Sequence, residues 1–374
     1  MTTEQQAEIE LLEAIGYVSA VPQKESGQVK KRGVTTHDAA RTHAGLNLYT
    51  SGHGPVATLI DMEGRVLHRW ERSPKDLWPG LKLKKRPRAK YFRRAWLLPN
   101  GDLLVVFTGL GLVRLDAQSN VLWKSVAGAH HDLEVQPNGD IYVLGRRARI
   151  VPWMNLKKPV LEDFIVITDS NGAVKQRISV LEAFRNTPYR QLIRKRRGDV
   201  LHTNTIHVLD GSIAEKLPAF AAGNILISMR TNSVIAVIDI QTKKIVWAKT
   251  GTFRLQHDPN LLENGNILLF DNGYGKLSQS RALELDPMDM SIVWKYPRGL
   301  EDPFFSSCCS LAQRLPNDNT LVVSADTGRA VEVTPSGDIV WEFLTPHVHL
   351  GYVRPIFEFV RLPADFPTDW ATAD

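Results

Sequence analysis

Two His-Asp pairs in this sequence occur in segments that resemble each other and could therefore occupy equivalent positions in a fold. His131 and Asp132 belong to HHDLEVQPNG, and His257 and Asp258 belong to QHDPNLLENG. Aligned on their Asn-Gly turns, the two segments place the histidines at the same position. A neutral imidazole can act as a nucleophile or can carry a proton to and from a substrate. The aspartates could orient such a site, or could equally cap turns and strand ends.

Further polar residues fall near the same register. His202 and Asn204 lie in LHTNTIHVLD, and Arg93 and Ser310 lie close to two other segments of the same kind. Guanidinium, imidazole and amide groups suit oxygens that carry dispersed negative charge. The sequence therefore predicts several polar side chains that converge on one axis.

Strand geometry separates some of these histidines. Successive side chains in a strand point to opposite faces, so His207 should face away from His202, and His130 should be the outward neighbour of His131. Several histidines together could also bind zinc or copper. Because no Glu-His pair four residues apart and no cysteine ligand accompanies them, we predict neither a metal site nor a cofactor.

Repeats supply the scaffold that such a site needs. One hairpin, whose second strand usually closes on Trp or Phe, recurs six times, at 57–70, 111–125, 164–178, 233–249, 281–296 and 329–343. A second hairpin, which turns at Asn-Gly or an equivalent, lies between these units at 95–107, 130–145, 223–229, 256–270 and 310–324. Two hairpins per period of about fifty residues predict one four-stranded antiparallel blade per period.

The repeats therefore predict an all-β fold, a six-bladed β-propeller whose inner strands line a central channel. Segments 45–52 and 354–363 should complete one blade and close the ring with strands from both ends of the chain. A short helix is expected within 181–195. The predicted units are a helical and polar N-terminal extension (1–44), the propeller as catalytic domain (45–365) and a C-terminal tail (366–374).

Composition agrees with one large globular core. The 374 residues are 43% hydrophobic and 23% charged, and no apolar run approaches the roughly eighteen residues of a membrane span. The N-terminus has neither the basic nor the apolar part of a secretory signal, so no export is predicted from it. The two cysteines, Cys308 and Cys309, are adjacent and cannot staple a loop.

Positive charge is concentrated in two runs. The formal net charge is +6, and the excess lies in 82–94 and 190–197. The run 82–94 should connect two blades, where it could also contact an anionic membrane surface. No recognition motif accompanies the charge, so no nucleic-acid partner is predicted.

Three stretches resemble the bacterial arylsulfate sulfotransferase family, namely LHTNTIHVLD, GNILISMRTNSVIAVID and QHDPNLLENGNILLFDNG with the following SRALELD. The resemblance covers most of 45–343. It implies a propeller enzyme that passes a sulfuryl group from an aryl sulfate to a phenol through a sulfohistidine, without a nucleotide sulfate donor. The absence of a G-x-x-x-x-G-K-[ST] phosphate loop agrees with that donor.

The resemblance implies a role for each matching residue. His257 would be the nucleophile, and the other matching residues would bind and stabilise the sulfuryl oxygens. The predicted catalytic residues are His257, His202, His131 and Arg230, and the predicted substrate-binding residues are Asn204, His130 and Arg93. A second histidine would protonate the leaving aryloxide and later deprotonate the acceptor.

This sequence also departs from the family. About ten extra residues, roughly 210–220, separate the H-x-N motif from Arg230, and the large N-terminal domain and paired cysteines of exported members are missing. AVIDIQTKKIVWA resembles the repeat of quinoprotein propellers, although six blades argue against that class. A non-catalytic propeller that binds a partner on its rim remains the alternative to the enzyme.

Overall fold

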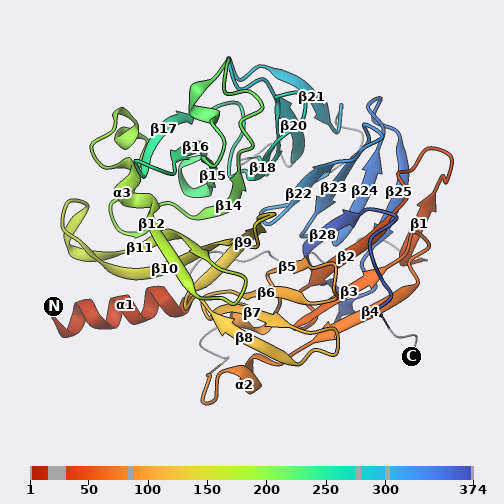
Figure 1. Cartoon of the computed structure of the whole chain (residues 1–374), viewed down its shortest axis with the longest axis horizontal. Helices are drawn as coiled ribbons and strands as arrows, with labels where there is room; N and C mark the ends of the chain where they lie inside the picture. The colour runs from red at the N-terminus through yellow and green to blue at the C-terminus, as the bar shows by residue number, and fades with distance from the viewer. Residues whose placement is uncertain (1, 16–30, 83–86, 274–278, 300–303, 372–374) are drawn as a thin grey trace.

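The computed structural model describes residues 2–15, 31–82, 87–273, 279–299 and 304–371. Within these residues, six sheets of four or five strands are arranged as blades around a common centre (Figure 1), and their strand pairs are antiparallel except for one short parallel pair in the third blade. The predicted six-bladed β-propeller is confirmed. Each inner strand begins a blade, except in the first blade, where the inner strand comes from the C-terminal end.

The blades use the strands in chain order. The first contains β28 (Ile356–Leu362), β2 (Leu46–Ser51), β3 (Val56–Ile60) and β4 (Val66–Glu71). The second contains β5 (Arg94–Leu97), β6 (Leu103–Phe107), β7 (Gly111–Leu115) and β8 (Val121–Ser125). The third contains β9 (Ala129–Val135), β10 (Ile141–Val151), β11 (Asn155–Thr168) and β12 (Val174–Ser179), with β13 (Gly198–Asp199) beside β11.

The remaining blades repeat this pattern. The fourth contains β14 (Thr203–Val208), β15 (Ile225–Met229), β16 (Val234–Asp239) and β17 (Lys244–Lys249). The fifth contains β18 (His257–Leu261), β19 (Ile267–Asp271), β20 (Arg281–Leu285) and β21 (Ile292–Tyr296). The sixth contains β22 (Leu311–Arg314), β23 (Thr320–Ser324), β24 (Arg329–Val333) and β25 (Ile339–Leu344), and the short hairpin β26 (Val348–His349) and β27 (Tyr352–Val353) follows.

Short helices occupy the connections. They are α2 (Pro74–Leu77), η2 (Pro87–Lys90), α3 (Val180–Phe184), η3 (Pro188–Leu192), η4 (Pro218–Phe220) and η5 (Arg230–Asn232). The helix expected within 181–195 is present as α3 followed by η3, because Pro188 cannot continue a helix that began before it. No helix in the part of the chain that the structure describes is long and apolar enough to cross a membrane.

Alternate side chains of the blades fill two different interfaces. In β6, Leu103 and Val105 pack against the first blade, whereas Leu104 and Val106 pack against the third. All four are fully buried. Comparable clusters fill the other interfaces between neighbouring blades. Each buried aliphatic side chain contributes about 1.5–3 kcal/mol to stability, so strands with two buried faces account for the near-continuous apolar runs in the repeats.

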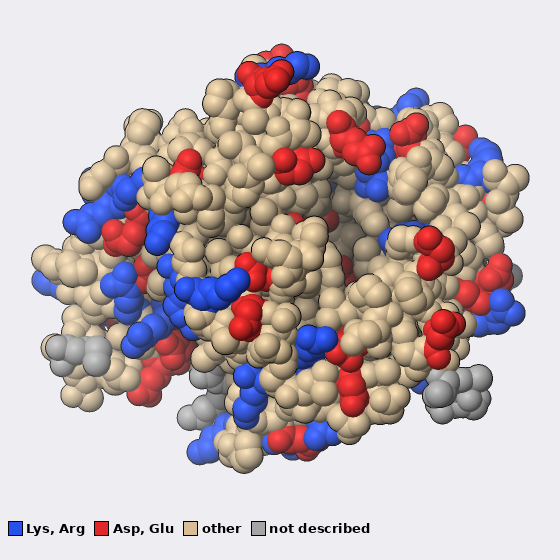
Figure 2. All heavy atoms as spheres, viewed as in Figure 1, with Lys and Arg blue, Asp and Glu red and all other residues tan. Residues whose placement is uncertain are grey.

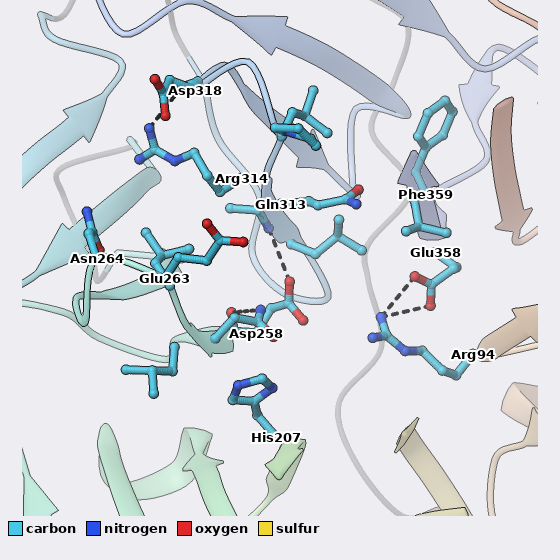
Figure 3. Close-up of a pocket in the computed structure, with 18 residues that line it drawn as sticks. Arg94, His207, Asp258, Glu263, Asn264, Gln313, Arg314, Asp318, Glu358 and Phe359 are labelled. Carbon is cyan, nitrogen blue, oxygen red and sulfur yellow. Dashed lines mark hydrogen bonds and ion pairs between the residues drawn. The ribbon is translucent and has the colours of Figure 1, made fainter. Parts of the chain in front are cut away.

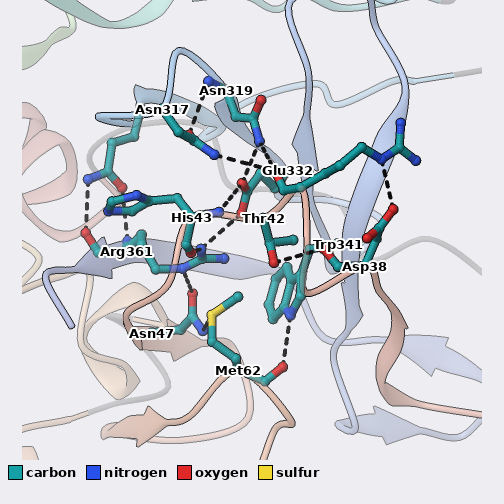
Figure 4. A network of polar contacts seen from close by, with 12 residues as sticks. Asp38, Thr42, His43, Asn47, Met62, Asn317, Asn319, Glu332, Trp341 and Arg361 are labelled. Carbon is teal, nitrogen blue, oxygen red and sulfur yellow. Dashed lines mark hydrogen bonds and ion pairs between the residues drawn. The ribbon is translucent and has the colours of Figure 1, made fainter.

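The ring closes where the sequence predicts, because β28 pairs with β2 along its length. A buried polar network anchors this closure (Figure 4). Arg361 donates from Nε to Oδ1 of Asn47 at 2.7 Å and from Nη1 to Oε2 of Glu332 at 2.9 Å. Oε1 of Glu332 accepts the backbone N–H of His43 at 2.7 Å. Glu332 therefore holds the first and last parts of the propeller to the sixth blade.

Polar contacts between inner strands also join every pair of neighbouring blades, and we call this set the inner belt. It runs from Glu358 to Arg94, from Arg94 to Asp132, from Asp132 to the N–H of Ile206, from Thr205 to the N–H of Asp258, from Asp258 to the N–H of Ala312, and from Gln313 to the N–H of Arg361. Asp132 and Asp258 thus bind the backbone of the next blade. Because those N–H groups are buried, the carboxylates satisfy donors that would otherwise be costly.

The N-terminal segment packs against the propeller through a helix and a strand. Helix α1 (Thr3–Ile15) packs through Ile9 and Leu12 against Leu161, and Lys158 forms an ion pair with Glu4 at 3.2 Å. Strand β1 (Gly33–His37) pairs with β25 and gives the sixth blade a fifth strand. The polar segment predicted for 1–44 therefore contains a strand, which its GVTTH sequence did not reveal because this strand belongs to no repeat.

The basic run 82–94 is only partly described, since residues 83–86 lie outside the described residues. Its last two residues, Arg93 and Arg94, point inward rather than to solvent. Arg93 lines a cavity in the channel, and Arg94 belongs to the inner belt. A membrane contact through this run stays a prediction.

Candidate active site

Five inner strands bring residues at or near their starts to one place in the channel. Arg93, His131, Asn204, His257 and Cys309 line a single cavity of about 20 Å³, which we call the histidine cavity. A cavity of this size holds roughly one water molecule. All five of these side chains can donate or exchange protons, and they lie at the inner strands of five different blades. The repeat alignment that paired His131 with His257 therefore places both side chains in one cavity.

The His257 ring is fixed from both sides. Its Nδ1 lies 2.6 Å from Oδ1 of Asn272, while Nδ2 of Asn272 donates to the carbonyl oxygen of Ser306 at 2.9 Å. Because Nδ2 of Asn272 donates to Ser306, Oδ1 of Asn272 faces the ring and accepts a hydrogen bond from Nδ1–H of His257. Nε2 is then unprotonated, and the backbone N–H of Cys309 reaches it at 3.3 Å.

His202 is held by a carboxylate instead. Its Nδ1 lies 2.6 Å from Oδ2 of Asp199, which stands on the short strand β13. The ring centroid of His202 lies 5.1 Å from that of His131, so the two imidazoles are neighbours. Burial raises the pKa of Asp199 to about 6, an effect that Lys195 opposes.

His130 lies behind His131 rather than in the histidine cavity. The Nδ1 atoms of the two rings are 2.9 Å apart, and Nε2 of His130 lies 3.6 Å from Oδ1 of Asp163. The side chain of His130 is completely buried. The contact between His130 and substrate stays a prediction. In the structure, His130 contacts and supports the ring of His131.

Arginines surround the histidines. Arg230 donates its backbone N–H to the carbonyl oxygen of His202 at 3.1 Å and its Nη2 to that of Ser307 at 3.2 Å. Arg93 donates to the carbonyl oxygen of Phe357 at 3.2 Å. Burial, and then the charges of these arginines, lower the pKa of His257 well below its ordinary value. Burial likewise lowers the pKa values of His131 and His202, so the rings are neutral at pH 7.

Asn204 also takes part in the fold. One of its two Nδ2 hydrogens goes to the carbonyl oxygen of Gln256 at 2.8 Å, just before His257, while Oδ1 accepts the hydroxyl of Thr205. An amide nitrogen has two hydrogens, so one donor remains for the cavity. Asn204 therefore fixes the approach to β18 as well as lining the site.

Several residues at this site adopt a left-handed backbone. The φ angles are 51° at His131, 54° at His202, 57° at Asp258 and 70° at Cys309. Side chains disfavour this region, and such residues cluster at functional sites. Irregular pairing at His257 and near the start of β9 accompanies them. Where the inner strands begin, these irregularities interrupt the regular alternation of side chains between the two faces of the sheet.

A much larger cavity of about 810 Å³, which we call the funnel, opens beside the histidine cavity and shares Arg94, Asp258 and Leu311 with it (Figure 3). His207 lines the funnel, where its Nδ1 lies 3.6 Å from Oε2 of Glu134. The molecular surface is hollowed near the middle of the face shown in Figure 2, with carboxylate side chains around the hollow.

Arg94 stands where the two cavities meet. It forms ion pairs with Asp132 at 2.7 Å and with Glu358 at 2.8 Å. Burial raises the pKa of Asp132 to about 6 and that of Glu358 to about 7, although Arg94 opposes both shifts. Burial also raises the pKa of Asp258. The boundary between the cavities thus contains several carboxyl groups whose pKa values burial raises, so that they bind a proton more readily than exposed carboxyl groups.

Sequence reasoning missed four of these groups. Asn272 follows β19 in the FDNG segment, and Asp199 precedes His202 by three residues. Arg94 is the last residue of the basic run 82–94, and Cys309 lies two residues before β22, the inner strand of the sixth blade. The Asn272 and Asp199 contacts depend on loops that no repeat places. Arg94 and Cys309 lie within two residues of the inner-strand register, so the alignment could have included them. Among the described residues, no group of three or more His, Cys, Asp or Glu is arranged to hold a metal ion.

Comparison with known proteins agrees with this architecture. A model of the family described as arylsulfotransferase (ASST) matches residues 94–345, which is more than half of the chain. The fold is similar to the crystal structure of a protein of unknown function from Bacteroides caccae, with a TM-score of 0.55 and 13% identity over 83% of this chain and 97% of that chain.

A second solved structure gives a weaker likeness. It is virginiamycin B lyase from Staphylococcus aureus, with a TM-score of 0.42 and 11% identity over 68% of this chain and 69% of that chain. At such identities, likeness to a solved structure bears on the fold alone. No curated protein matches the chain.

Proposed function

Because the chain belongs to the arylsulfotransferase family, we propose that it moves a sulfuryl group from an aryl sulfate to a phenol through a sulfohistidine at His257. The observation that carries the proposal is the fixed His257 ring. With Nδ1 bound to Asn272 and the ring neutral, the lone pair of Nε2 faces the cavity that His131, Asn204 and Arg93 also line. A neutral, oriented imidazole is a competent nucleophile.

In the first half-reaction, Nε2 attacks the sulfur and the bond between sulfur and the aryl oxygen breaks. The sulfuryl group needs more room than one water, so side chains that line the histidine cavity must move when the donor binds. The backbone N–H of Cys309 makes a long hydrogen bond to Nε2 of His257, at 3.3 Å. It can turn to a sulfuryl oxygen once Nε2 has formed its new bond.

His202 carries the proton for the leaving aryloxide. Because the ring is neutral in the free protein and its own proton on Nδ1 faces Asp199, Nε2 takes up a proton from solvent when the anionic donor binds, and passes it to the aryloxide as the bond to sulfur breaks. Asp199 holds its Nδ1, which leaves Nε2 as the second exchangeable site, and a carboxylate partner stabilises the imidazolium that forms when the ring takes up a proton. In the second half-reaction, the same ring removes the proton from the acceptor phenol as its oxygen attacks the sulfohistidine. One pocket serves both halves, which gives ping-pong kinetics.

Positive and neutral donors stabilise the charge that is spread over the sulfuryl oxygens. Arg230 and Arg93 both act on His257 through their charges, and Asn204 keeps one amide hydrogen for the cavity. Donors aimed at developing charge in a buried site are worth far more than in water. No nucleotide is needed, since the aryl sulfate itself supplies the sulfuryl group.

The test is release of 4-nitrophenol from 4-nitrophenyl sulfate in the presence of phenol, with phenyl sulfate identified as the second product. Double-reciprocal plots at several phenol concentrations should be parallel, as ping-pong kinetics require. A purified, folded protein that gives no release with a range of phenols would favour the non-catalytic propeller instead.

A further inference from the structure

Cys308 and Cys309 precede the sixth inner strand, and the peptide bond between them contacts the proposed nucleophile. The N–H of this peptide belongs to Cys309 and lies 3.3 Å from Nε2 of His257. Its carbonyl oxygen belongs to Cys308 and accepts the hydroxyls of Ser306 at 2.9 Å and Ser310 at 3.4 Å. One edge of this peptide is thus held by serines, and the other faces the catalytic ring.

The two thiols are in contact with each other inside the protein. Both cysteines are free and buried, and Cys309 lines the histidine cavity. A hydrogen bond from the Cys308 thiol, assisted by the charge of Arg93, lowers the pKa of Cys309 to about 7, while the same contact raises the pKa of Cys308. A thiol of low pKa beside a second thiol is the arrangement found in cysteines that peroxide oxidises reversibly.

We propose that Cys308 and Cys309 form a dithiol that hydrogen peroxide oxidises, and that this oxidation switches sulfuryl transfer off. The inference rests on the proposed role of His257. The Cys309 thiolate attacks one peroxide oxygen, the O–O bond breaks, and hydroxide leaves while a sulfenic acid forms. The Cys308 thiol then attacks the sulfenic sulfur, a disulfide forms, and water leaves. Two thiols are oxidised to one disulfide as one peroxide is reduced to two waters.

Closing this disulfide has to disturb the peptide that contacts His257. The ring formed contains the Cys308–Cys309 peptide bond itself. A trans peptide holds neighbouring Cα atoms about 3.8 Å apart, whereas disulfides usually join Cα atoms roughly 4.4–6.8 Å apart. The backbone must therefore reorient, which withdraws the Cys309 N–H from Nε2 and the Cys308 carbonyl from its two serines.

The size of the histidine cavity selects the oxidant. It holds roughly one water, so hydrogen peroxide fits where a bulky aromatic disulfide reagent does not. The neighbouring funnel shares Arg94, Asp258 and Leu311 with it and is wide enough for solvent. We therefore expect oxidation by peroxide to be much faster than modification by 5,5′-dithiobis(2-nitrobenzoic acid).

The experiment treats the full chain with hydrogen peroxide at neutral pH and follows intact mass, dimedone labelling, and 4-nitrophenyl sulfate turnover together. Wild type should lose the mass of two hydrogens and at least about 90% of its activity in parallel, and dithiothreitol should restore both. Cys308→Ser should stop at the sulfenic acid, which dimedone labels. Cys309→Ser should keep its mass and should keep after treatment the activity that it had before.

Three outcomes would overturn the switch. They are equal peroxide inactivation of Cys309→Ser and wild type, a disulfide that forms without loss of turnover, and thiols that stay reduced while wild type is inactivated. If the reduced protein transfers no sulfuryl group at all, the proposed function fails instead. The mass change and the hydrogen exchange of the Cys309 amide then still decide whether the disulfide forms and frees that N–H from His257.

Discussion

Nδ1 of His202 lies 2.6 Å from a carboxylate oxygen of Asp199. His257 makes a contact of the same length to the uncharged amide of Asn272. A carboxylate partner stabilises the protonated ring through its charge. The uncharged amide of Asn272 fixes the proton of His257 on Nδ1 and raises the pKa of the ring less than burial and the charges of Arg230 and Arg93 lower it. The two histidines are therefore prepared for different work, His202 for carrying a proton and His257 for attacking with a lone pair.

Replacing the carboxylate of Asp199 should separate these roles. In Asp199→Asn, His202 loses the group that stabilises its protonated form, so protonation of the leaving aryloxide should weaken. Turnover of phenyl sulfate, whose leaving group needs a proton, should fall about 10²- to 10⁴-fold. Turnover of 4-nitrophenyl sulfate, which has a far better leaving group, should fall by about tenfold or less. Equal losses on both donors would contradict the role given to His202.

The opposite exchange tests the nucleophile. Asn272→Asp places an anionic partner against Nδ1 of His257, which raises the pKa of the ring. Because the protonated ring cannot attack, kcat/KM for 4-nitrophenyl sulfate should fall at low pH, and the acid limb of its pH profile should move upward by about one pH unit or more. Asn272→Ala, which removes the partner without adding charge, should lower the rate without moving that limb. A pH profile of Asn272→Asp identical to that of wild type would show that Nδ1 is not the site of control.

The fold was predictable because its repeats carry their own register. Strands such as Leu103–Phe107 must be apolar on both faces to pack between two blades, and this requirement marks each hairpin in the sequence. The N-terminal and C-terminal segments were recognisable because one blade lacked two strands. Strand β1 was not, since Gly33–His37 lies on an outer edge where no repeat and no buried face constrains its residues.

The site was predictable only as far as the inner strands reach. His131 and His257 could be aligned because each stands at or near the start of an inner strand, where the Asn-Gly turns fix the position. Asn272 comes from the end of β19, and Asp199 comes from a two-residue strand outside the repeat. Their contacts depend on how loops fold back onto the channel, which the pattern of apolar residues does not encode.

Arg230 should increase the rate of sulfuryl transfer, but it is not the residue that forms the bond to sulfur. Its charge acts on His257 and His202, and its backbone supports His202, so Arg230→Ala keeps the nucleophile but loses a cation beside the sulfuryl oxygens. Turnover should fall about 10²- to 10³-fold, which corresponds to roughly 2.7–4 kcal/mol. Arg194→Ala, which removes an exposed arginine from the connection between β12 and β13, is the matched control and should retain wild-type turnover. A loss under about threefold in Arg230→Ala would place this arginine outside the site.

The buried carboxyl group of Glu358 should leave a signature in the pH dependence of stability. Its folded-state pKa is raised to about 7, so between about pH 4.5 and 7 the folded protein holds a proton that the unfolded chain releases. The contribution of Glu358 is therefore fully present at low pH and is lost as the pH rises through 7. Buried neutral histidines act oppositely and lower stability below about pH 6.5, where the unfolded chain binds their protons.

The variant Glu358→Gln isolates the first effect. Its stability relative to wild type should improve as the pH rises from 5 to 8, because the glutamine does not lose a proton. Urea unfolding at pH 5, 6.5 and 8 measures the difference. Curves for the two proteins that stay parallel over this range would mean that Glu358 is ionised throughout, with Arg94 outweighing burial.

The sulfohistidine itself is the most direct prediction. Protein mixed with an aryl sulfate in the absence of a phenol should gain one sulfuryl group, detectable by intact mass and mapped by fragmentation to the peptide that contains His257. The adduct should be stable in alkali and labile in acid, as expected for a bond from nitrogen to sulfur. Added phenol should remove it and yield the aryl sulfate of that phenol, because the second half-reaction needs only the acceptor.

His257→Ala should abolish both the adduct and turnover, because it removes the nitrogen whose protonation state and direction the Asn272 and Cys309 contacts fix. The matched control is His68→Ala, which removes an imidazole from the outer strand of the first blade, where it contacts the carbonyl oxygen of Ala117. His68→Ala should form the adduct at the wild-type rate. If His257→Ala keeps the adduct while His131→Ala or His202→Ala loses it, the sulfuryl group is carried by that other ring. The contact between His257 and Asn272 would then serve the fold alone.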